Sequence, residues 1–270
     1  MEIVSGRGLM TDLDWQRRLC DNVARVRQNI ADACRRAGRA PHAVRLVGVT
    51  KYVSPAVLRG LLAAGLIDLG ENHVQQLVTR AQECGPARLD WPDADSDANA
   101  APPLPRWHML GHLQRNKVKL LLPHARILHS LDSERLALTL QEQAELLDAR
   151  VDVLIEVNVA GEATKTGVPP ASVRPLLNAV ARCPRLDLRG LMTMTPYDSD
   201  AEASRPYFRR LRELLDNLRA RGDVRPDCVH LSMGMSQDYV VAVEEGATFV
   251  RVGAALFEGL PSTDPRAVSG

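Results

Sequence analysis

The chain has 270 residues, with 34 Lys and Arg against 33 Asp and Glu, and 45% of it is hydrophobic. The balanced charge argues against a general nucleic-acid or membrane-surface role, and no apolar run approaches the ~20 residues of a membrane span. The five cysteines lie far apart without a CxxC pair, so we expect neither a disulfide framework nor a zinc site.

The first residues, 1–10, show no basic start followed by an apolar block, so they are unlike a secretory signal. We expect a disordered leader there, with Met10 as an alternative start. We also expect the protein to be cytoplasmic and monomeric. Apolar residues then recur every three or four positions from Leu19 to Ala33. This spacing predicts an amphipathic helix that ends before Gly38 and Pro41.

After this helix, short apolar runs alternate with amphipathic segments. The predicted strands are Arg45–Thr50, Leu66–Gly70, Trp107–Gly111, Arg126–Leu131, Val151–Val159, Leu186–Met194, Cys228–Met233 and Thr248–Val252. The predicted helices are Pro55–Ala64, His73–Glu83, Arg115–Leu122, Ser133–Ala149, Pro170–Arg182, Ala201–Arg221 and Ser236–Glu245. The pattern favours an α/β fold, a single (β/α)₈ TIM barrel over residues 11–262 with a tail at 263–270. A doubly wound open sheet is the alternative.

One segment departs from this alternation. Residues 86–105 are rich in Pro, Ala and Asp and show no periodicity. Such a composition cannot bury enough apolar surface to order itself. We therefore predict a flexible surface insertion between the second helix and the third strand, dispensable for folding.

Lys51 follows directly on the first predicted strand. In a barrel, the residues at the carboxyl ends of the strands meet on one rim, where such enzymes place their chemistry. An ammonium at the end of a buried strand can be desolvated, which favours the neutral amine that a Schiff base requires. A solvated strand-end charge is the simpler reading of any single lysine.

The last two strand ends resemble an anion site. Ser232 to Ser236 form a turn into a helix, with Ser236 as a possible N-cap, and Arg251 and Gly253 follow the eighth strand. Exposed amides at such a position bind phosphate, and barrel phosphate sites are often built from the loops after strands seven and eight. Plain capping by the serines and an ion pair of Arg251 remain the alternatives.

His108 and His112 have the HxxxH spacing of some metal sites. On a strand and its turn this spacing does not converge, so we predict packed or hydrogen-bonded histidines and no metal. Dinucleotide, P-loop and α/β-hydrolase motifs are absent from the sequence.

A strand-end lysine and a phosphate site across the barrel suggest pyridoxal 5′-phosphate (PLP), with its aldehyde on Lys51 and its phosphate at Ser232–Ser236 and Gly253. A sugar-phosphate aldolase that uses a lysine Schiff base shares these features and stays open as the competing reading.

The segments VGVTK, GENHVQQL, WHMLGHLQRNKVK, LHSLDS, GLMTM, HLSMGMSQDY and VRVGAALFEG occur in this order. In this respect the chain, from about Leu19 to Phe257, resembles the pyridoxal phosphate homeostasis proteins, which are related to the barrel domain of alanine racemase. The resemblance implies PLP fold type III with the cofactor on Lys51 as an aldimine and Asn72 beside it. It implies phosphate contacts from Ser232, Ser236 and the Gly253-Ala254 amides, and Arg251 at the pyridine nitrogen, which weakens the ring as an electron sink.

Two positions depart from the family pattern. Ala254 stands where Thr or Ser is common, and Phe257-Glu258-Gly259 replaces an ending with a basic residue.

The resemblance implies a PLP carrier that supplies apo-enzymes with the cofactor. The chain ends soon after the eighth strand, without the further domain that carries a racemase's second base. We therefore expect a non-catalytic protein, with a weak racemase or lyase of fold type III as the alternative.

Overall fold

The computed structural model describes residues 12–260 except 52, 93–103, 163–165 and 197–199. The predicted leader and the C-terminal tail thus lie outside the described residues. The strands are β1 (Arg45–Val49), β2 (Asp68–Glu71), β3 (Arg106–Met109), β4 (Ile127–Leu131), β5 (Val151–Glu156), β6 (Leu186–Met192), β7 (His230–Ser232) and β8 (Phe249–Val252). All eight predicted strands are present, each one to three residues shorter than predicted, with no start or end more than three residues from its predicted position.

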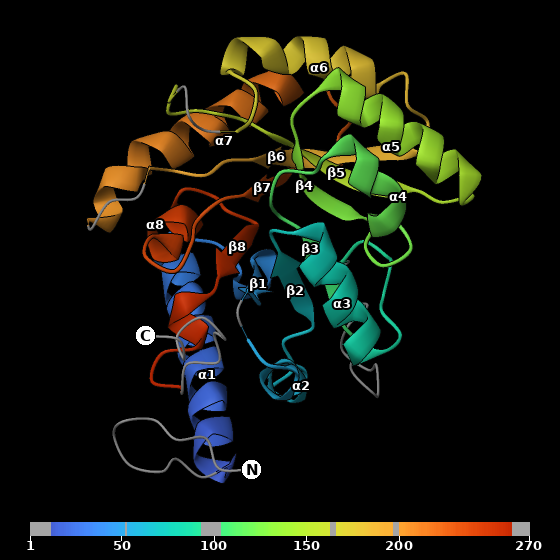
Figure 1. Ribbon diagram of the computed structural model, residues 1–270. Helices are drawn as coiled ribbons and strands as arrows, with labels where there is room; N and C mark the ends of the chain where they lie inside the picture. The colour runs from blue at the N-terminus through green and yellow to red at the C-terminus, as the bar shows by residue number, and fades with distance from the viewer. Residues whose placement is uncertain (1–11, 52, 93–103, 163–165, 197–199, 261–270) are drawn as a thin grey trace.

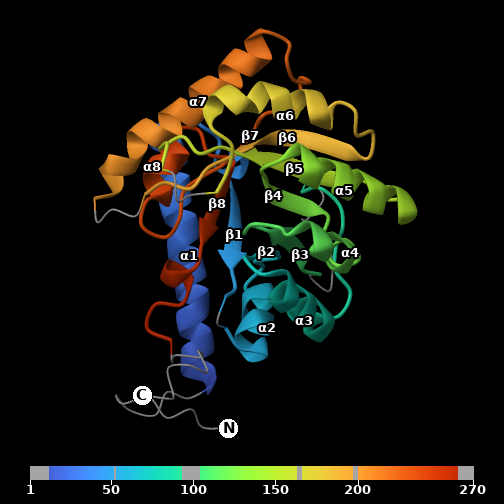
Figure 2. The same cartoon turned by 45° about the horizontal axis from the view of Figure 1, so that its top comes forward.

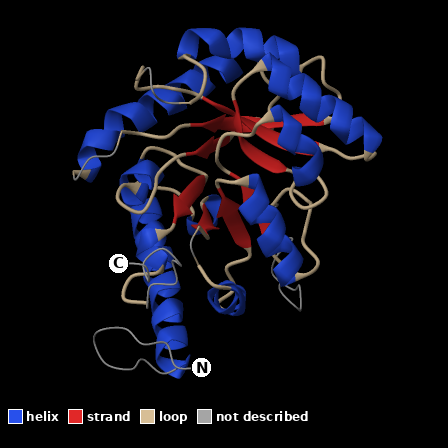
Figure 3. Cartoon of the chain, viewed as in Figure 1, coloured by secondary structure: helices blue, strands red, loops and turns tan. Residues whose placement is uncertain are grey.

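Helices follow the strands around the outside of the sheet (Figure 3). They are α1 (Asp12–Arg36), α2 (Pro55–Ala63), α3 (Val74–Cys84), α4 (Val118–Leu121), α5 (Glu134–Leu146), α6 (Val173–Val180), α7 (Arg205–Ala220) and α8 (Tyr239–Glu244). Short 3₁₀ turns precede α4, α6 and α7 and account for the first residues of those predicted helices.

The sheet is a closed barrel in which each strand pairs in parallel with the next and β8 pairs with β1. In the closing pair, Gly48 lies opposite Val252. The (β/α)₈ prediction is confirmed. The doubly wound alternative is wrong, because in an open sheet β1 and β8 would not pair with each other.

The N-terminal helix α1 packs across this closure, against α2 and α8, and Figures 1 and 2 both show it beside α8. Its predicted apolar stripe is buried, from Leu19 to Ala33. Burial of such a stripe is the main source of stability for a helix of this kind. As predicted, the helix ends before Gly38: its last residue is Arg36. Gly38 has a φ of 66°, which suits glycine.

The interior of the barrel combines an apolar layer with many polar groups. Val47, Ile127, Leu154, Met192 and Phe249 form one cluster there. Other buried residues of the strands are polar or charged; they are Asp68, Arg106, His108, His129, Asp152, Glu156, Ser232 and Arg251. Buried polar groups of this kind require partners, which determine the geometry described below.

The predicted flexible insertion is packed in its described part. Trp91 is 9% exposed and belongs to the interior cluster, with its ring 5.4 Å from that of Phe249. Asp90 pairs with Arg88 and Arg106. The prediction of a free loop is therefore wrong for this stretch, because composition averaged over 86–105 hid one tryptophan able to fill the barrel's end. Residues 93–103 lie outside the described residues.

Within the described part of the chain, no helix is both long and apolar enough to cross a membrane.

Candidate functional site

Lys51 lies at the carboxyl rim, directly after β1. Its neighbour Thr50 is fully buried and donates its N–H to the carbonyl of Gly70 at 3.0 Å. The Thr50 hydroxyl donates to a carboxylate oxygen of Glu71 at 2.6 Å. These bonds hold the strand end, whereas the Lys51 side chain itself is exposed. The expected burial of this side chain is therefore not found in the described part of the structure.

Glu71 anchors the loop after β1. It is buried, and its carboxylate accepts the hydrogen bond from the Thr50 hydroxyl and forms an ion pair with Arg80 at 2.8 Å. Arg80 also donates to the carbonyl of Val53 at 2.9 Å. Burial raises the pKa of Glu71, and the bonds from Thr50 and Arg80 offset this only in part. Sequence patterns did not single out Arg80, whose partner is brought near only by folding.

Gly253 and the turn after it present two converging backbone donors. The N–H groups of Gly253 and Ala255 both donate to the hydroxyl oxygen of Ser236, at 3.0 and 3.4 Å. A Cβ on Gly253 would lie 3.4 Å from the Val49 carbonyl oxygen, so this turn lies against the end of β1. The Gly253 turn thus lies beside the end of β1, which precedes Lys51, and not across the barrel from it, because closure makes the first and last strands neighbours.

Ser236 is not an N-cap. Helix α8 begins at Tyr239 and follows Asp238, and Asp238 accepts the N–H of Met235 at 2.7 Å. Asp238 also accepts the hydroxyls of Thr195 and Ser204, both at 2.9 Å. The capping prediction is wrong because Asp238 fixes the turn, which leaves Ser236 free to reach Gly253.

Arg251 is buried in the barrel, under the same rim. Its guanidinium donates to the hydroxyl oxygen of Ser232 at 2.7 Å and to the carbonyl of Thr193 at 2.9 Å. Burial lowers the pKa of Arg251 to about 10, so it remains charged at neutral pH. Among the described residues no carboxylate lies within ion-pair distance of it, which removes the structural ion pair as its explanation.

The remaining predicted residues lie on the same rim. Asn72 follows β2, is half-buried, and its carbonyl oxygen would be 2.3 Å from a Cβ on Gly111, so only glycine fits there. Ala254 is exposed and opens the turn after Gly253. Glu258 is turned away toward α1, where it pairs with Arg25 at 2.6 Å.

Glu156, at the end of β5, was not predicted. It is buried, one oxygen accepts the hydroxyl of Thr166 at 2.6 Å, and the other has no hydrogen-bond partner among the described residues. Burial raises the pKa of Glu156, which the bond from Thr166 offsets only in part. A buried carboxyl at the end of a strand offered no periodic signal in the sequence.

His108 and His112 do not converge. His108 is buried in the barrel and bonds Asp68 and His129, both at 3.0 Å. His112 lies on the surface and bonds Asp132 at 2.8 Å. The prediction of hydrogen-bonded histidines is confirmed.

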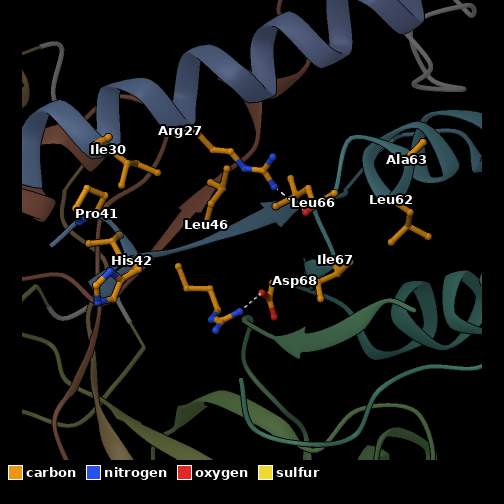
Figure 4. Close-up of a pocket in the computed structure, with 14 residues that line it drawn as sticks. Arg27, Ile30, Pro41, His42, Leu46, Leu62, Ala63, Leu66, Ile67 and Asp68 are labelled. Atoms are coloured by element: carbon orange, nitrogen blue, oxygen red, sulfur yellow. Dashed lines mark hydrogen bonds and ion pairs between the residues drawn. The ribbon is translucent and has the colours of Figure 1, made fainter. Parts of the chain in front are cut away.

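A cavity of about 610 Å³ lies at the opposite end of the barrel, between α1, α2 and the starts of β1 and β2. Figure 4 shows Arg27 reaching across it toward the chain beside Leu66, where it donates to the carbonyl of Gly65 at 2.7 Å. Asp68 lines its other side and pairs with Arg45 at 3.1 Å. This cavity is separate from the rim that carries Lys51.

The rim fits the groups that PLP presents. Two backbone N–H groups that already share one oxygen acceptor suit a phosphate oxygen. A primary amine on the neighbouring strand suits an aldehyde, and a buried guanidinium with donors to spare suits a ring nitrogen.

Comparison with known proteins identifies the family of the chain. The family model of the alanine racemase N-terminal domain matches residues 22–261. The pyridoxal phosphate homeostasis protein of Aquifex aeolicus is 42% identical over 238 residues, which cover 88% of this chain and 96% of that protein. The protein of the same name from Pseudomonas aeruginosa is 37% identical, over 88% of this chain and 94% of that one.

Solved structures extend the likeness to three dimensions. PipY of Synechococcus elongatus, solved with PLP bound, has a TM-score of 0.71 at 29% identity, covering 88% of this chain and 99% of that one. Alanine racemase of Clostridium difficile, 16% identical with a TM-score of 0.65, shares the fold over 93% of this chain and 61% of its own. The chain therefore belongs to the pyridoxal phosphate homeostasis proteins, built on the barrel of the alanine racemase N-terminal domain.

Proposed function

We propose that this protein binds PLP at the rim, on Lys51, and supplies it to apo-enzymes as part of PLP homeostasis. The observation that carries the proposal is the pair of N–H groups of Gly253 and Ala255, which converge on one acceptor beside the end of β1. The names of its relatives and the PLP-bound PipY structure support the same ligand.

Each group at the rim has a separate task. PLP supplies an aldehyde that condenses reversibly with a primary amine. Lys51 offers that amine in an exposed position, where a competing amine can also arrive. The amides of Gly253 and Ala255 hold the phosphate, Asn72 borders the ring, and the guanidinium of Arg251 donates to the ring nitrogen and keeps it unprotonated.

An exposed amine suits release better than catalysis. Enzymes commonly exclude water from the reacting centre, whereas Lys51 is open to solvent. A carrier needs only a reversible bond and access for the recipient's own lysine. The names of the relatives describe homeostasis and not a reaction, which supports the same choice over a weak racemase or lyase.

The first test traps the covalent link. Borohydride treatment of the PLP-loaded protein should leave a stable adduct on the peptide that contains Lys51. Lys51→Ala should remain folded and give no adduct, while Lys119→Ala, an exposed lysine on α4, should behave like the wild type. An adduct on another lysine in Lys51→Ala would show that the site is misassigned.

The second test measures supply. The loaded protein is mixed with an apo PLP enzyme, and recovered activity is followed while a phosphatase hydrolyses free PLP. Recovery faster than from an equal amount of free PLP with the same phosphatase supports the carrier. Recovery no faster than from free PLP contradicts delivery while leaving binding intact.

A further inference from the structure

A continuous line of hydrogen bonds runs through the barrel from one end to the other. Asp68 bonds His108 at 3.0 Å, His108 bonds His129 at 3.0 Å, and His129 bonds Ser232 at 2.8 Å. Ser232 in turn receives Arg251 at 2.7 Å. The five side chains come from β2, β3, β4, β7 and β8, and none is more than 4% exposed.

The two ends of this line determine its direction. A guanidinium can only donate hydrogen bonds and an ionised carboxylate can only accept them. Burial opposes the ionisation of Asp68, but the bond from His108 and the charges of Arg106 and Arg45 outweigh it, so the pKa of Asp68 is lowered. Asp68 therefore accepts, and the Nε2 of His108 carries the proton that it donates to Asp68.

The groups between the ends then have one arrangement. Burial lowers the pKa of His108 and His129, so each ring is neutral, with one donor and one acceptor nitrogen. The Nδ1 of His108 accepts from the Nε2–H of His129, whose Nδ1 accepts the hydroxyl proton of Ser232. The Ser232 oxygen is left to accept from Arg251.

We propose that Asp68, His108, His129 and Ser232 form a one-way hydrogen-bond chain that positions Arg251 for the cofactor. The proposal rests on the proposed function only in assigning Arg251 to the ring nitrogen. It makes the two histidines positioning residues, although both lie below the rim. It also commits the single hydroxyl proton of Ser232 to His129, so Ser232 has none to donate to phosphate.

The same chain explains how Arg251 is tolerated in the interior. A buried charge is costly unless other groups compensate it, and no carboxylate contacts Arg251 among the described residues. Along the chain, every donor dipole points from Arg251 toward the negative charge of Asp68. Asp68 also lines the cavity at the far end of the barrel, so the chain links the two faces of the molecule.

The ligand-free protein tests the direction of the chain. Nitrogen-15 NMR of labelled histidine rings distinguishes the two neutral tautomers and the cation. Both His108 and His129 should be neutral and protonated at Nε2 from about pH 6 to pH 8, across the range where an ordinary histidine titrates. A cation, or an Nδ1–H tautomer, at either ring would overturn the one-way arrangement whether or not the protein binds PLP.

A Ser232→Ala variant tests the positioning of Arg251. It should lower the affinity for PLP by about tenfold, a typical loss for one buried hydrogen bond. It should also shift the absorbance band of the bound cofactor. It should weaken pyridoxal by the same factor, because the phosphate contacts remain. Loss confined to PLP, with pyridoxal binding unchanged, would place Ser232 at the phosphate and refute the chain's role.

Two further variants complete this test. His129→Gln removes the next link and should reproduce the absorbance shift, which keeps the proposal testable if Ser232→Ala does not fold. His230→Gln removes another barrel histidine, which bonds Thr248 at 3.2 Å and interacts electrostatically with His129, and it should shift the band less than either of the other variants. Equal shifts in all three variants would indicate general damage to the barrel and would contradict the proposal. If the wild type fails to bind PLP, the proposed function fails. The histidine tautomers measured by NMR would still show whether the hydrogen-bond chain has the proposed direction.

Discussion

In the proposed site, the contacts to phosphate are backbone donors and not side chains. Gly253 and Ala255 direct their N–H groups at one point, now held by the Ser236 oxygen. The sequence indicated Gly253, because a glycine after a barrel strand permits close approach. It did not indicate Ala255, since any residue supplies a backbone N–H and only the turn aims it.

From these donors we predict strong selection for the phosphate. Charge-assisted hydrogen bonds contribute about 1.5–3 kcal/mol each, so pyridoxal should bind at least about tenfold more weakly than PLP. Ser236→Ala should change this ratio less, because both amides remain. Equilibrium titration of both ligands measures it, and equal affinities for the wild type would remove the phosphate site from the proposal.

The buried histidines predict a pH dependence of stability. Burial lowers the pKa of His108 and, with the neighbouring His108 as a second cause, that of His129 well below its ordinary 6.5. Below pH 6.5 the unfolded chain binds protons that the folded chain does not. The free energy of unfolding therefore decreases as the pH falls below 6.5, and these residues contribute no slope above it.

We expect His129→Gln to reduce this dependence. Each histidine adds up to about 1.4 kcal/mol per pH unit below its unfolded pKa. Urea denaturation at several pH values from neutral downward measures the slope for variant and wild type. Parallel curves would mean that His129 is protonated in the folded protein, which contradicts its neutral state.

At the scale of elements, the described start of the segment before β3 is anchored in the barrel. Trp91 is buried against His230 and Phe249, with the guanidinium of Arg189 5.2 Å from its ring centre. It belongs to the apolar cluster inside the barrel. The segment's average composition predicted flexibility, but a single aromatic side chain of this size is enough to anchor its start.

We predict that only this anchored part matters for stability. Trp91→Ala should lower the free energy of unfolding by about 3 kcal/mol, as is typical for a large buried aromatic residue. Replacing 93–103 with a short Gly/Ser linker should change it little, since loop-closure entropy varies slowly with length. Denaturant unfolding measures both. A small effect of Trp91→Ala, or a large one of the linker, would reverse the assignment.

At the scale of the whole molecule, the proposed site would favour transfer over turnover. Arg251 keeps its charge at neutral pH, with a pKa lowered only to about 10, and a guanidinium beside a pyridine nitrogen leaves the ring a poor electron sink. Lys51 is open to solvent on the same face. The two features together suit a protein that holds the cofactor without using it.

We therefore expect the loaded protein to convert neither L- nor D-amino acids at a useful rate. Incubation with a panel of both, followed by chiral chromatography, measures conversion, with Lys51→Ala as the control for background chemistry. Turnover at an ordinary enzymatic rate of ~1–10³ s⁻¹ that depends on Lys51 would make the protein an enzyme.

The sequence by itself determined the barrel and the membership of its rim. Alternating strand and helix periods leave few folds to choose from, and the strand-end rule of barrels then selects Lys51, Asn72, Arg251 and Gly253. These inferences depend on local patterns, which a linear chain displays directly.

Only the tertiary structure decided which residues of the rim contact and hydrogen-bond one another. Closure of β8 on β1 brings Gly253 beside the end of Lys51's strand. Ser232 meets His129 across 103 residues of sequence, and in the proposed chain this bond uses the hydroxyl proton that the sequence predicted for phosphate. Such contacts depend on strand register and on the direction of each side chain, because a buried polar group takes the nearest complementary partner that folding provides.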